Sequence, residues 1–325
     1  MKYPVKWLLE GDPWVAYSTR RGLLDEDISS SDMKNIYMTM ENDPLVSRLL
    51  NEMEGWGRNV VNNHKNPSHL YHKLNLLADM GLTLKTPQIA KAVETILCHR
   101  DVNGVPQVLI NVPKHFGGTG RDDWGWALCD APVLLYTLLK LGMKECVLES
   151  GISHLVMLAQ ENGWPCAVSP ELGKFRGPGR KDDPCPYATL RMVKLLQCCS
   201  RWKGSAEALS GAEALLGLWE RSLQEHPYMF YMGTDFRKLK APLIWYDIVS
   251  VSDVLACCPQ IHSDKRFKEM LDCIMSKADA NGYFTPESVY LSMKDWEFGQ
   301  KKEPSRWLTL CIYKLLKQAG VPMEA

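Results

Sequence analysis

A turn sequence built on glycine recurs along this chain at a nearly constant interval. It reads EGW at Gly55, NGV at Gly104, NGW at Gly163 and NGY at Gly282. The last interval is roughly double the one before it, and the missing copy falls at QEHPY (224–228), which resembles QENGW (160–164). A period of about 60 residues indicates one supersecondary unit copied several times.

Two kinds of helical pattern alternate between these turns. One kind is apolar on nearly every face, as expected of helices buried all round, and covers 69–80, 128–141, 187–199, 243–258 and 307–316. The other kind, over 87–98 and 265–277, carries apolar residues at i, i+3, i+4 and i+7, so it covers a core on one side only. Glycine after such a helix suits a left-handed helix C-terminus.

This order of buried helix, amphipathic helix and glycine turn predicts the architecture. We expect an all-α chain of about six helix pairs, with inner helices buried and outer helices half-exposed. An open solenoid would need polar caps on its end repeats, and these are not evident. The sequence therefore predicts an (α/α)6 toroid, a two-layer α/α barrel that forms a single domain over residues 1–325.

Composition limits the partners and the compartment. Lys plus Arg and Asp plus Glu both number 38, so net charge gives no reason to expect a nucleic-acid partner. No apolar run reaches membrane-spanning length without charge, so no stable membrane insertion is expected. The 11 cysteines are an odd number and indicate a reducing compartment, so we expect a cytoplasmic protein. The sequence indicates no oligomeric state.

Polar and aromatic residues gather where loops enter the buried helices. They are His69, His72, Trp124, Trp126, Cys129, Asp130, Asp182, Asp183, Cys185, Tyr187, Trp245, Tyr246, Asp247, Arg306 and Trp307. In a toroid these loops form the mouth of the barrel, so the side chains are expected to converge. Ionisable groups near buried helices cost free energy unless they are paired. Their number therefore favours a functional site over helix capping alone.

Three basic loops precede three successive buried helices. Their cations are Arg176, Arg180 and Lys181 in the first loop, Arg237, Lys238 and Lys240 in the second, and Lys301, Lys302 and Arg306 in the third. Convergent cations with helix N-termini behind them suit phosphate or carboxylate. We therefore expect an anion site, although charge in a loop is more often simply solvated.

The segment GRKDDPCPYATL (179–190), together with the Q-x-N-G-W turn unit, resembles the terpenoid-cyclase and protein-prenyltransferase superfamily. The resemblance covers most of the chain and implies the toroid fold and an isoprenoid diphosphate or related anionic small-molecule substrate. It implies that Arg180 and Lys181 hold the diphosphate, and that Asp183 and Cys185 bind zinc. The later histidine of that family has no counterpart here, and His69, His72 or Asp247 would have to take its place.

Other chemistries remain open. Asp182 and Asp183 match part of the acid motif of class II cyclases, but flanking Arg180 and Lys181 would lower the pKa of that acid. A glycoside hydrolase or polysaccharide lyase acting on acidic sugars would use Asp130 and Asp247 as its carboxylates. Trp126, Tyr187, Trp245, Tyr246 and Trp307 would line any of these sites. A non-catalytic binding scaffold is the third alternative, after the favoured prenyltransferase-like enzyme and the sugar-cleaving enzyme.

Overall fold

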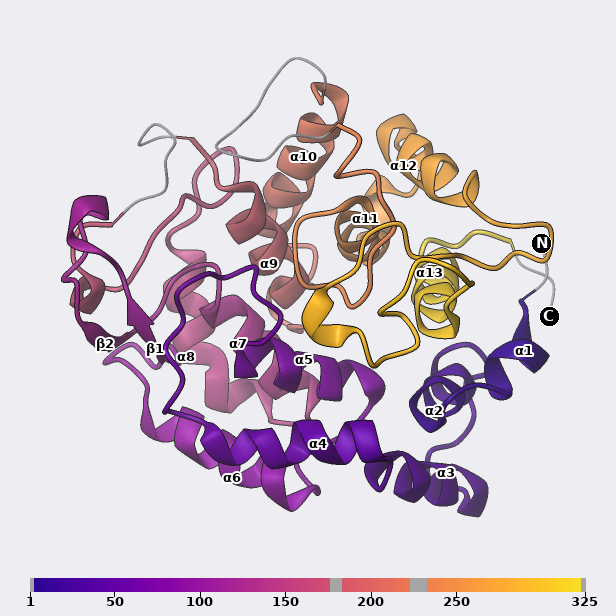
Figure 1. The fold of residues 1–325 in the computed structure, drawn as a ribbon. Coiled ribbons are helices and arrows are strands. Elements are labelled where there is room, and N and C mark those ends of the chain that lie inside the picture. The colour runs from indigo at the N-terminus through magenta and orange to yellow at the C-terminus, as the bar shows by residue number, and fades with distance from the viewer. Residues whose placement is uncertain (1–2, 176–182, 223–232, 323–325) are drawn as a thin grey trace. The chain divides into compact units, whose positions relative to one another are not determined.

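The computed structural model describes residues 3–175, 183–222 and 233–322 (Figure 1). Helix dominates, at 51% of the chain, and the sheet in the described residues consists of two strands. The fold class predicted from the sequence, all-α and consistent with an (α/α)6 toroid, is therefore confirmed. The chain divides into two compact units, which are described separately below, and the predicted single domain stays a prediction.

Unit 1 contains residues 1–48, 79–82 and 233–325, so it is built from both terminal segments of the chain. Its elements are α1 (Val5–Leu9), α2 (Pro13–Gly22), α3 (Ser31–Glu41), α11 (Ile248–Ala256), η4 (Pro259–Ile261), α12 (Lys265–Met275), η5 (Leu291–Met293) and α13 (Arg306–Gln318). α13 packs against α1, α2 and α11, and α12 covers α11. The predicted buried and amphipathic helices of this unit are thus present.

Unit 2 contains residues 49–78 and 83–232. Its elements are η1 (Met53–Gly55), α6 (Pro87–Cys98), β1 (Val108–Asn111), η2 (Lys114–Phe116), β2 (Asp122–Gly125), α7 (Ala131–Lys140), α8 (Glu145–Val156), η3 (Pro170–Leu172), α9 (Pro186–Leu196) and α10 (Ala206–Glu220). α4 (Pro44–Glu52) and α5 (Leu70–Met80) run from one unit into the other. α9 packs against both α7 and α10.

The recurring turn has the same hydrogen bonds in both units. In unit 2, Asp101 Oδ1 accepts from the backbone N–H groups two and four residues later, both at 2.9 Å. In unit 1, Asp279 Oδ1 does the same at 2.8 and 2.9 Å. The glycine between them has a positive φ in each copy, +84° at Gly104 and +80° at Gly282, which glycine adopts without steric cost. The sequence repeat therefore marks a local device that reverses the chain.

A β-hairpin in unit 2 was only weakly indicated by the sequence. β1 and β2 are antiparallel, and Val108 lies opposite Gly125. Val61 joins the edge of β1 through a parallel bridge to Ile110, with its N–H donating to Leu109 O at 2.7 Å. The hairpin thereby fixes the loop that leads into α5.

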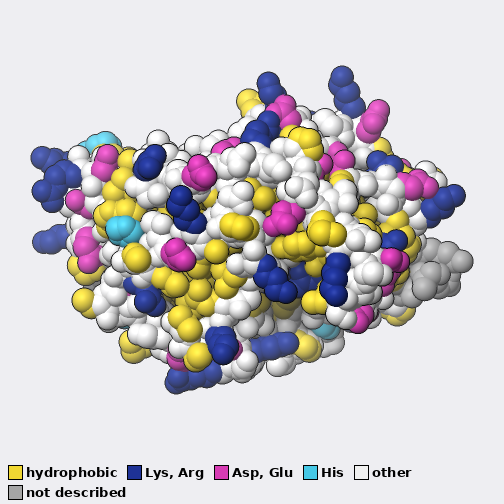
Figure 2. All heavy atoms as spheres, turned by 90° about the horizontal axis from the view of Figure 1, so that it is seen from below, with side chains coloured by type: hydrophobic (Ala, Val, Ile, Leu, Met, Phe, Trp, Pro, Cys, Tyr) yellow, Lys and Arg dark blue, Asp and Glu magenta, His cyan; other side chains and the backbone are white. Residues whose placement is uncertain are grey.

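One face of the molecule carries charged side chains of both signs interspersed among apolar atoms (Figure 2). This mixture agrees with the equal numbers of acidic and basic residues in the sequence. Within the described ranges, no helix is both long enough and apolar enough to span a bilayer.

Candidate active site

A cavity of about 390 Å³ opens in unit 2. Its walls come from the loop before α5, from β1 and the segment after it, and from the chain around η3. The lining residues are Val61, Asn62, His64, Ile110, Asn111, Val112, Pro113, Phe116, Ala127, Val168, Leu172 and Phe175. This volume lies in the range of small-molecule sites. A small-molecule partner, as the sequence predicted, therefore fits the structure.

Two side chains of α5 hold the loop that carries His64. The hydroxyl of Tyr71 donates to His64 O at 2.9 Å, and His72 Nε2 lies 2.6 Å from the same oxygen. Burial lowers the pKa of His72 well below its ordinary value, so the neutral ring can donate from Nε2. His72, predicted as a metal ligand, is here a support for the backbone of His64.

Asp130 lies directly before α7 and is completely buried. Both of its carboxyl oxygens accept from Ala127 N, at 3.1 and 3.2 Å. Its Oδ2 lies 3.5 Å from His64 Nδ1. Ala127 and His64 both line the cavity, so the carboxyl sits immediately behind the cavity wall.

Burial favours the uncharged form of both members of this pair. It raises the pKa of Asp130 well above its ordinary value, against the opposing effect of nearby backbone N–H groups. Burial, with a smaller contribution from His69, lowers the pKa of His64 to about 4. A carboxyl group whose protonated form is favoured in this way is suited to proton donation.

The orientation of the imidazole is set by burial. His64 Nδ1 is buried and, among the described residues, has no hydrogen-bond partner within normal geometry. Its side chain is nevertheless 25% exposed, so the exposed part is the other edge of the ring. A separation of 3.5 Å is long for a hydrogen bond, but catalytic contacts often tighten only when substrate binds.

Three thiols gather beside the carboxyl. Cys185, at the start of α9, forms thiol hydrogen bonds with Cys129 and Cys166. The contact with Cys129, together with burial, raises the pKa of Cys185 to about 12. At neutral pH this side chain is therefore a thiol, and a thiol is a poor nucleophile.

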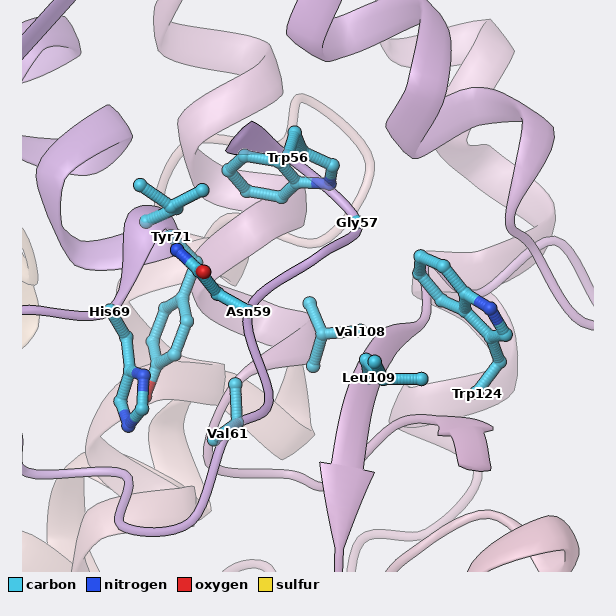
Figure 3. A pocket seen from close by; sticks show the side chains of 10 residues that line it. Trp56, Gly57, Asn59, Val61, His69, Tyr71, Val108, Leu109 and Trp124 are labelled. Carbon is cyan, nitrogen blue, oxygen red and sulfur yellow. The ribbon is translucent and has the colours of Figure 1, made fainter. Parts of the chain in front are cut away.

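A second hollow adjoins the first through Val61 (Figure 3). Trp56, Asn59 and His69 line one part of it, and Leu109 and Trp124 another. Its volume is about 20 Å³. A single water needs roughly 10–15 Å³ of such space. The hollow thus holds one water at most, and the larger cavity is the candidate site.

The predicted site residues of unit 2 are placed as follows. Asp130 lies at the cavity, while Asp183 is half-buried at the start of the described segment 183–222. Trp126 is buried and its indole donates to Asp101 Oδ2 at 2.9 Å. Tyr187 is buried beneath the Arg191 guanidinium, 4.7 Å from its ring centre. Arg176, Arg180, Lys181 and Asp182 lie outside the described residues.

The predicted site residues of unit 1 have internal partners. Lys238 and Lys240 both pair with Asp235, at 3.4 and 3.2 Å. Arg306 Nε donates to Trp7 O at 2.9 Å, and its guanidinium lies over the Trp7 ring. The other residues of the set are buried or half-buried in this unit: Arg237, Trp245, Tyr246, Asp247 and Trp307. Their roles in anion or substrate binding stay predictions.

Zinc also stays a prediction. Among the described residues, no group of three or more His, Cys, Asp and Glu is arranged to hold a metal ion. Of the proposed ligands, His72 is engaged with His64 O and Cys185 with two other thiols.

Sequence reasoning missed His64. It lies in the polar segment NNHKNP (62–67) before α5, a loop position equivalent to those of the residues that were selected. A histidine in a loop that enters a buried helix was the available signal. Its pairing with Asp130 depends on contacts that only the folded unit supplies.

The chain matches no protein-family model and no curated protein sequence. Among solved structures it is similar to an unsaturated glucuronyl hydrolase from Bacillus sp. GL1, with 13% identity, 94% of this chain and 84% of that chain covered, and a TM-score of 0.46. It is similar to a glycoside hydrolase family 76 mannosidase from Bacteroides thetaiotaomicron, with 10% identity, coverage of 97% and 88%, and a TM-score of 0.49. A family 76 α-mannanase from the same organism gives 15% identity, coverage of 96% and 86%, and a TM-score of 0.44.

The resemblance to the terpenoid-cyclase and protein-prenyltransferase superfamily, including the squalene-cyclase type of repeat, is wrong. These solved structures are glycoside hydrolases. The expectation of a prenyltransferase-like or cyclase-like enzyme with an isoprenoid diphosphate substrate falls with it. The Q-x-N-G-W turn that carried part of the resemblance is held by backbone hydrogen bonds between Gln160 and Gly163, which require no particular side chains. The other part, segment 179–190, lies partly outside the described residues.

Proposed function

We propose that this chain is an enzyme that cleaves glycosidic bonds in a carbohydrate by acid–base catalysis. The observation that carries the proposal is the completely buried Asp130 carboxyl, 3.5 Å from the imidazole of His64, which lines a cavity of about 390 Å³. Burial raises the pKa of that carboxyl and so favours its protonated form. An acetal oxygen is a weak base and leaves readily only when it is protonated. Enzymes that break such bonds keep a carboxylic acid of raised pKa for this purpose.

The pair would act as a relay. Asp130 holds its proton toward His64 Nδ1, so the neutral ring carries its own proton on Nε2. Nε2–H gives that proton to the glycosidic oxygen while the Asp130 proton moves to Nδ1. The bond from the anomeric carbon to the oxygen breaks, and water adds its oxygen to that carbon. The proton that the water releases returns to the pair. His64 is the catalytic residue, and Asp130 positions it and stores its proton.

Elimination is the second candidate. No carboxylate stands among the described cavity-lining residues, whereas hydrolases of the two-carboxylate type need a pair. In the other tautomer, with the ring proton on Nδ1, His64 Nε2 could instead take the proton next to the carboxylate of a uronic acid. The bond from the neighbouring ring carbon to the glycosidic oxygen then breaks, and His64 returns the proton to the leaving oxygen. The product would then carry a new carbon–carbon double bond, which absorbs ultraviolet light, and no water would be consumed.

The test is a panel of neutral glycosides and uronic-acid oligosaccharides, with reducing ends and ultraviolet absorbance followed together. Reducing ends without absorbance indicate hydrolysis, and both together indicate elimination. Asp130→Asn should abolish either activity in a folded protein, while Asp272→Asn, on the exposed face of α12, should not. Full activity of the Asp130→Asn variant, or no cleavage of any member of the panel, would overturn the proposal.

A further inference from the structure

The walls of the cavity are mostly apolar. In the described lining, the polar side chains are those of Asn62, His64 and Asn111, and the others are aliphatic, proline or phenylalanine. The Asn111 amide already donates to Asp122 Oδ1 at 2.7 Å. Hydrogen bonding to a ligand is therefore concentrated on the loop of Asn62 and His64, and the remaining walls favour a group without polar atoms.

Phe116 is the most informative part of that apolar wall. It is 58% exposed, although it is a large hydrophobic residue that lines the cavity. Burying apolar surface is favourable by about 25 cal/mol for each Å² removed from water, so an apolar group that covers this ring would bind favourably. Single exposed apolar residues are common on protein surfaces. Phe116 is different, because it lines a cavity together with Phe175 and Leu172 and so forms part of an apolar binding surface.

The backbone holds this wall in place. Lys174 N donates to Gly117 O at 2.8 Å, which ties the residue after Phe116 to the residue before Phe175. A Cβ added at Gly173 would lie 2.7 Å from Gly117 O, so the two segments are in close contact. The aromatic wall is therefore a preformed surface, which lowers the entropic cost of binding a rigid group.

The volume allows an apolar group and a sugar together. A cavity of roughly 150 Å³ accommodates benzene. The cavity here has about 390 Å³, which leaves space for a sugar ring beside an aryl ring. The bond to be broken would lie between the sugar ring at the polar loop and the apolar group.

We propose that the substrate is a glycoside with an apolar aglycone, aryl or alkyl, which occupies the wall of Phe116, Leu172 and Phe175. This inference rests on the proposed function for the cleavage of the bond, but the apolar binding site stands on the lining alone. A glycan composed only of sugars would place polar hydroxyl groups against these apolar walls.

The experiment compares Phe116→Ala with Met157→Ala, a matched truncation of an exposed apolar side chain at the end of α8. Binding of fluorophenol is followed by fluorine NMR, and KM is measured for the aryl and methyl glycosides of one sugar. We expect Phe116→Ala to weaken fluorophenol binding and to raise KM for the aryl glycoside on the order of tenfold, corresponding to about 1.4 kcal/mol. KM for the methyl glycoside, and both parameters in Met157→Ala, should stay unchanged.

The two proposals fail separately. Fluorophenol binding that depends on Phe116, without cleavage of any glycoside, would retain the apolar site and overturn the proposed function. Cleavage with equal KM for aryl and methyl glycosides, and no fluorophenol binding, would overturn the apolar aglycone and retain the proposed function.

Discussion

Two buried helices, one in each unit, begin directly after a completely buried aspartate. In unit 1, Asp247 accepts from Ser250 N at 2.9 Å and caps α11 in the usual way. In unit 2, Asp130 makes no N-cap hydrogen bond to α7, and its carboxyl lies against the backbone N–H groups of Ala127 and Ala131 and against His64. The same residue type at the same position in the repeat therefore has two roles.

The backbone at the two cap positions differs. An N-cap side chain accepts from the second or third N–H of its helix, and the cap residue usually has an extended backbone. Asp247 has that extended conformation, with φ −145° and ψ 169°, whereas Asp130 has φ −121° and ψ −46°. A buried carboxyl that is released from capping can take part in chemistry.

The sharpest test of this comparison substitutes each aspartate in a separate variant. Asp130→Asn should lower the rate of glycoside cleavage by about 10²- to 10⁴-fold, because the stored proton is lost. Asp247→Ala should leave the rate unchanged and lower the free energy of unfolding by about 1 kcal/mol through loss of the cap. Rates and thermal denaturation of both variants decide this, and equal rates in the two would end the distinction.

The pH dependence of kcat/KM should also distinguish Asp130 from Asp247. Activity should fall as pH drops through about 4, because protonated His64 can no longer accept the Asp130 proton. Activity should also fall at high pH, once Asp130 loses its proton above its raised pKa. In Asp130→Asn, any residual activity should lack the alkaline limb, while Asp247→Asn should keep both limbs. An alkaline limb that persists without Asp130 would assign it to another group.

A third buried carboxyl extends the comparison to stability. Glu297 accepts from Ser305 Oγ, Arg306 N and Trp307 N at 2.7–3.0 Å and so caps α13 from outside that helix. Burial raises the pKa of Glu297 to about 7, so the folded state favours its protonated form. The free energy of unfolding should therefore fall by about 3 kcal/mol as pH rises from 4.5 to about 7. Urea titrations of Glu297→Gln should show a flatter pH profile, and those of exposed Glu303→Gln the original one.

The turn shared by both units should show the smallest effects. Gly163, Gly282 and Gly142 all have positive φ, so alanine costs about 1–2 kcal/mol at each. An added Cβ would also meet Thr189 Oγ1 at 2.6 Å in the first and Tyr313 Oη at 2.5 Å in the second, but nothing within 4 Å in the third. Gly163→Ala and Gly282→Ala should therefore lower the melting temperature more than Gly142→Ala. Equal decreases in melting temperature would show that the close contacts of Gly163 and Gly282 do not add to the cost of the alanine substitution.

Sequence reasoning reached the helices because their signals are local. The stripe over 87–98 coincides with α6 at both ends, since an apolar period and a leading proline are properties of neighbouring residues. The β1–β2 hairpin was not placed, because its register depends on a partner strand and on the bridge from Val61. A local sequence pattern predicts a single helix or strand, whereas the pairing of distant segments depends on the folded structure.

The candidate site was reached only in part, for a related reason. A polar residue before a buried helix was enough to select Asp130. His64 became its neighbour through the hydrogen bonds of Tyr71 and His72 to the His64 carbonyl, and no spacing in the sequence encodes those. The superfamily resemblance failed because it rested on the short segment 179–190 and on a turn at 160–164 that is held by backbone hydrogen bonds.

The composition of unit 1 bears on the order in which the chain can fold during synthesis. Trp7 stacks on Tyr283 at 3.9 Å, and its carbonyl accepts from Arg306, so α1 makes these contacts only once the last part of the chain is present. Unit 2 is synthesised completely before the last segment of unit 1. Until then, the apolar faces of α1 and α2 that pack against that segment stay uncovered. Limited proteolysis of chains arrested after residue 232 should cleave the first 48 residues before it cleaves unit 2. The earliest residues to leave the ribosome would then be the last to fold, and the most dependent on chaperones.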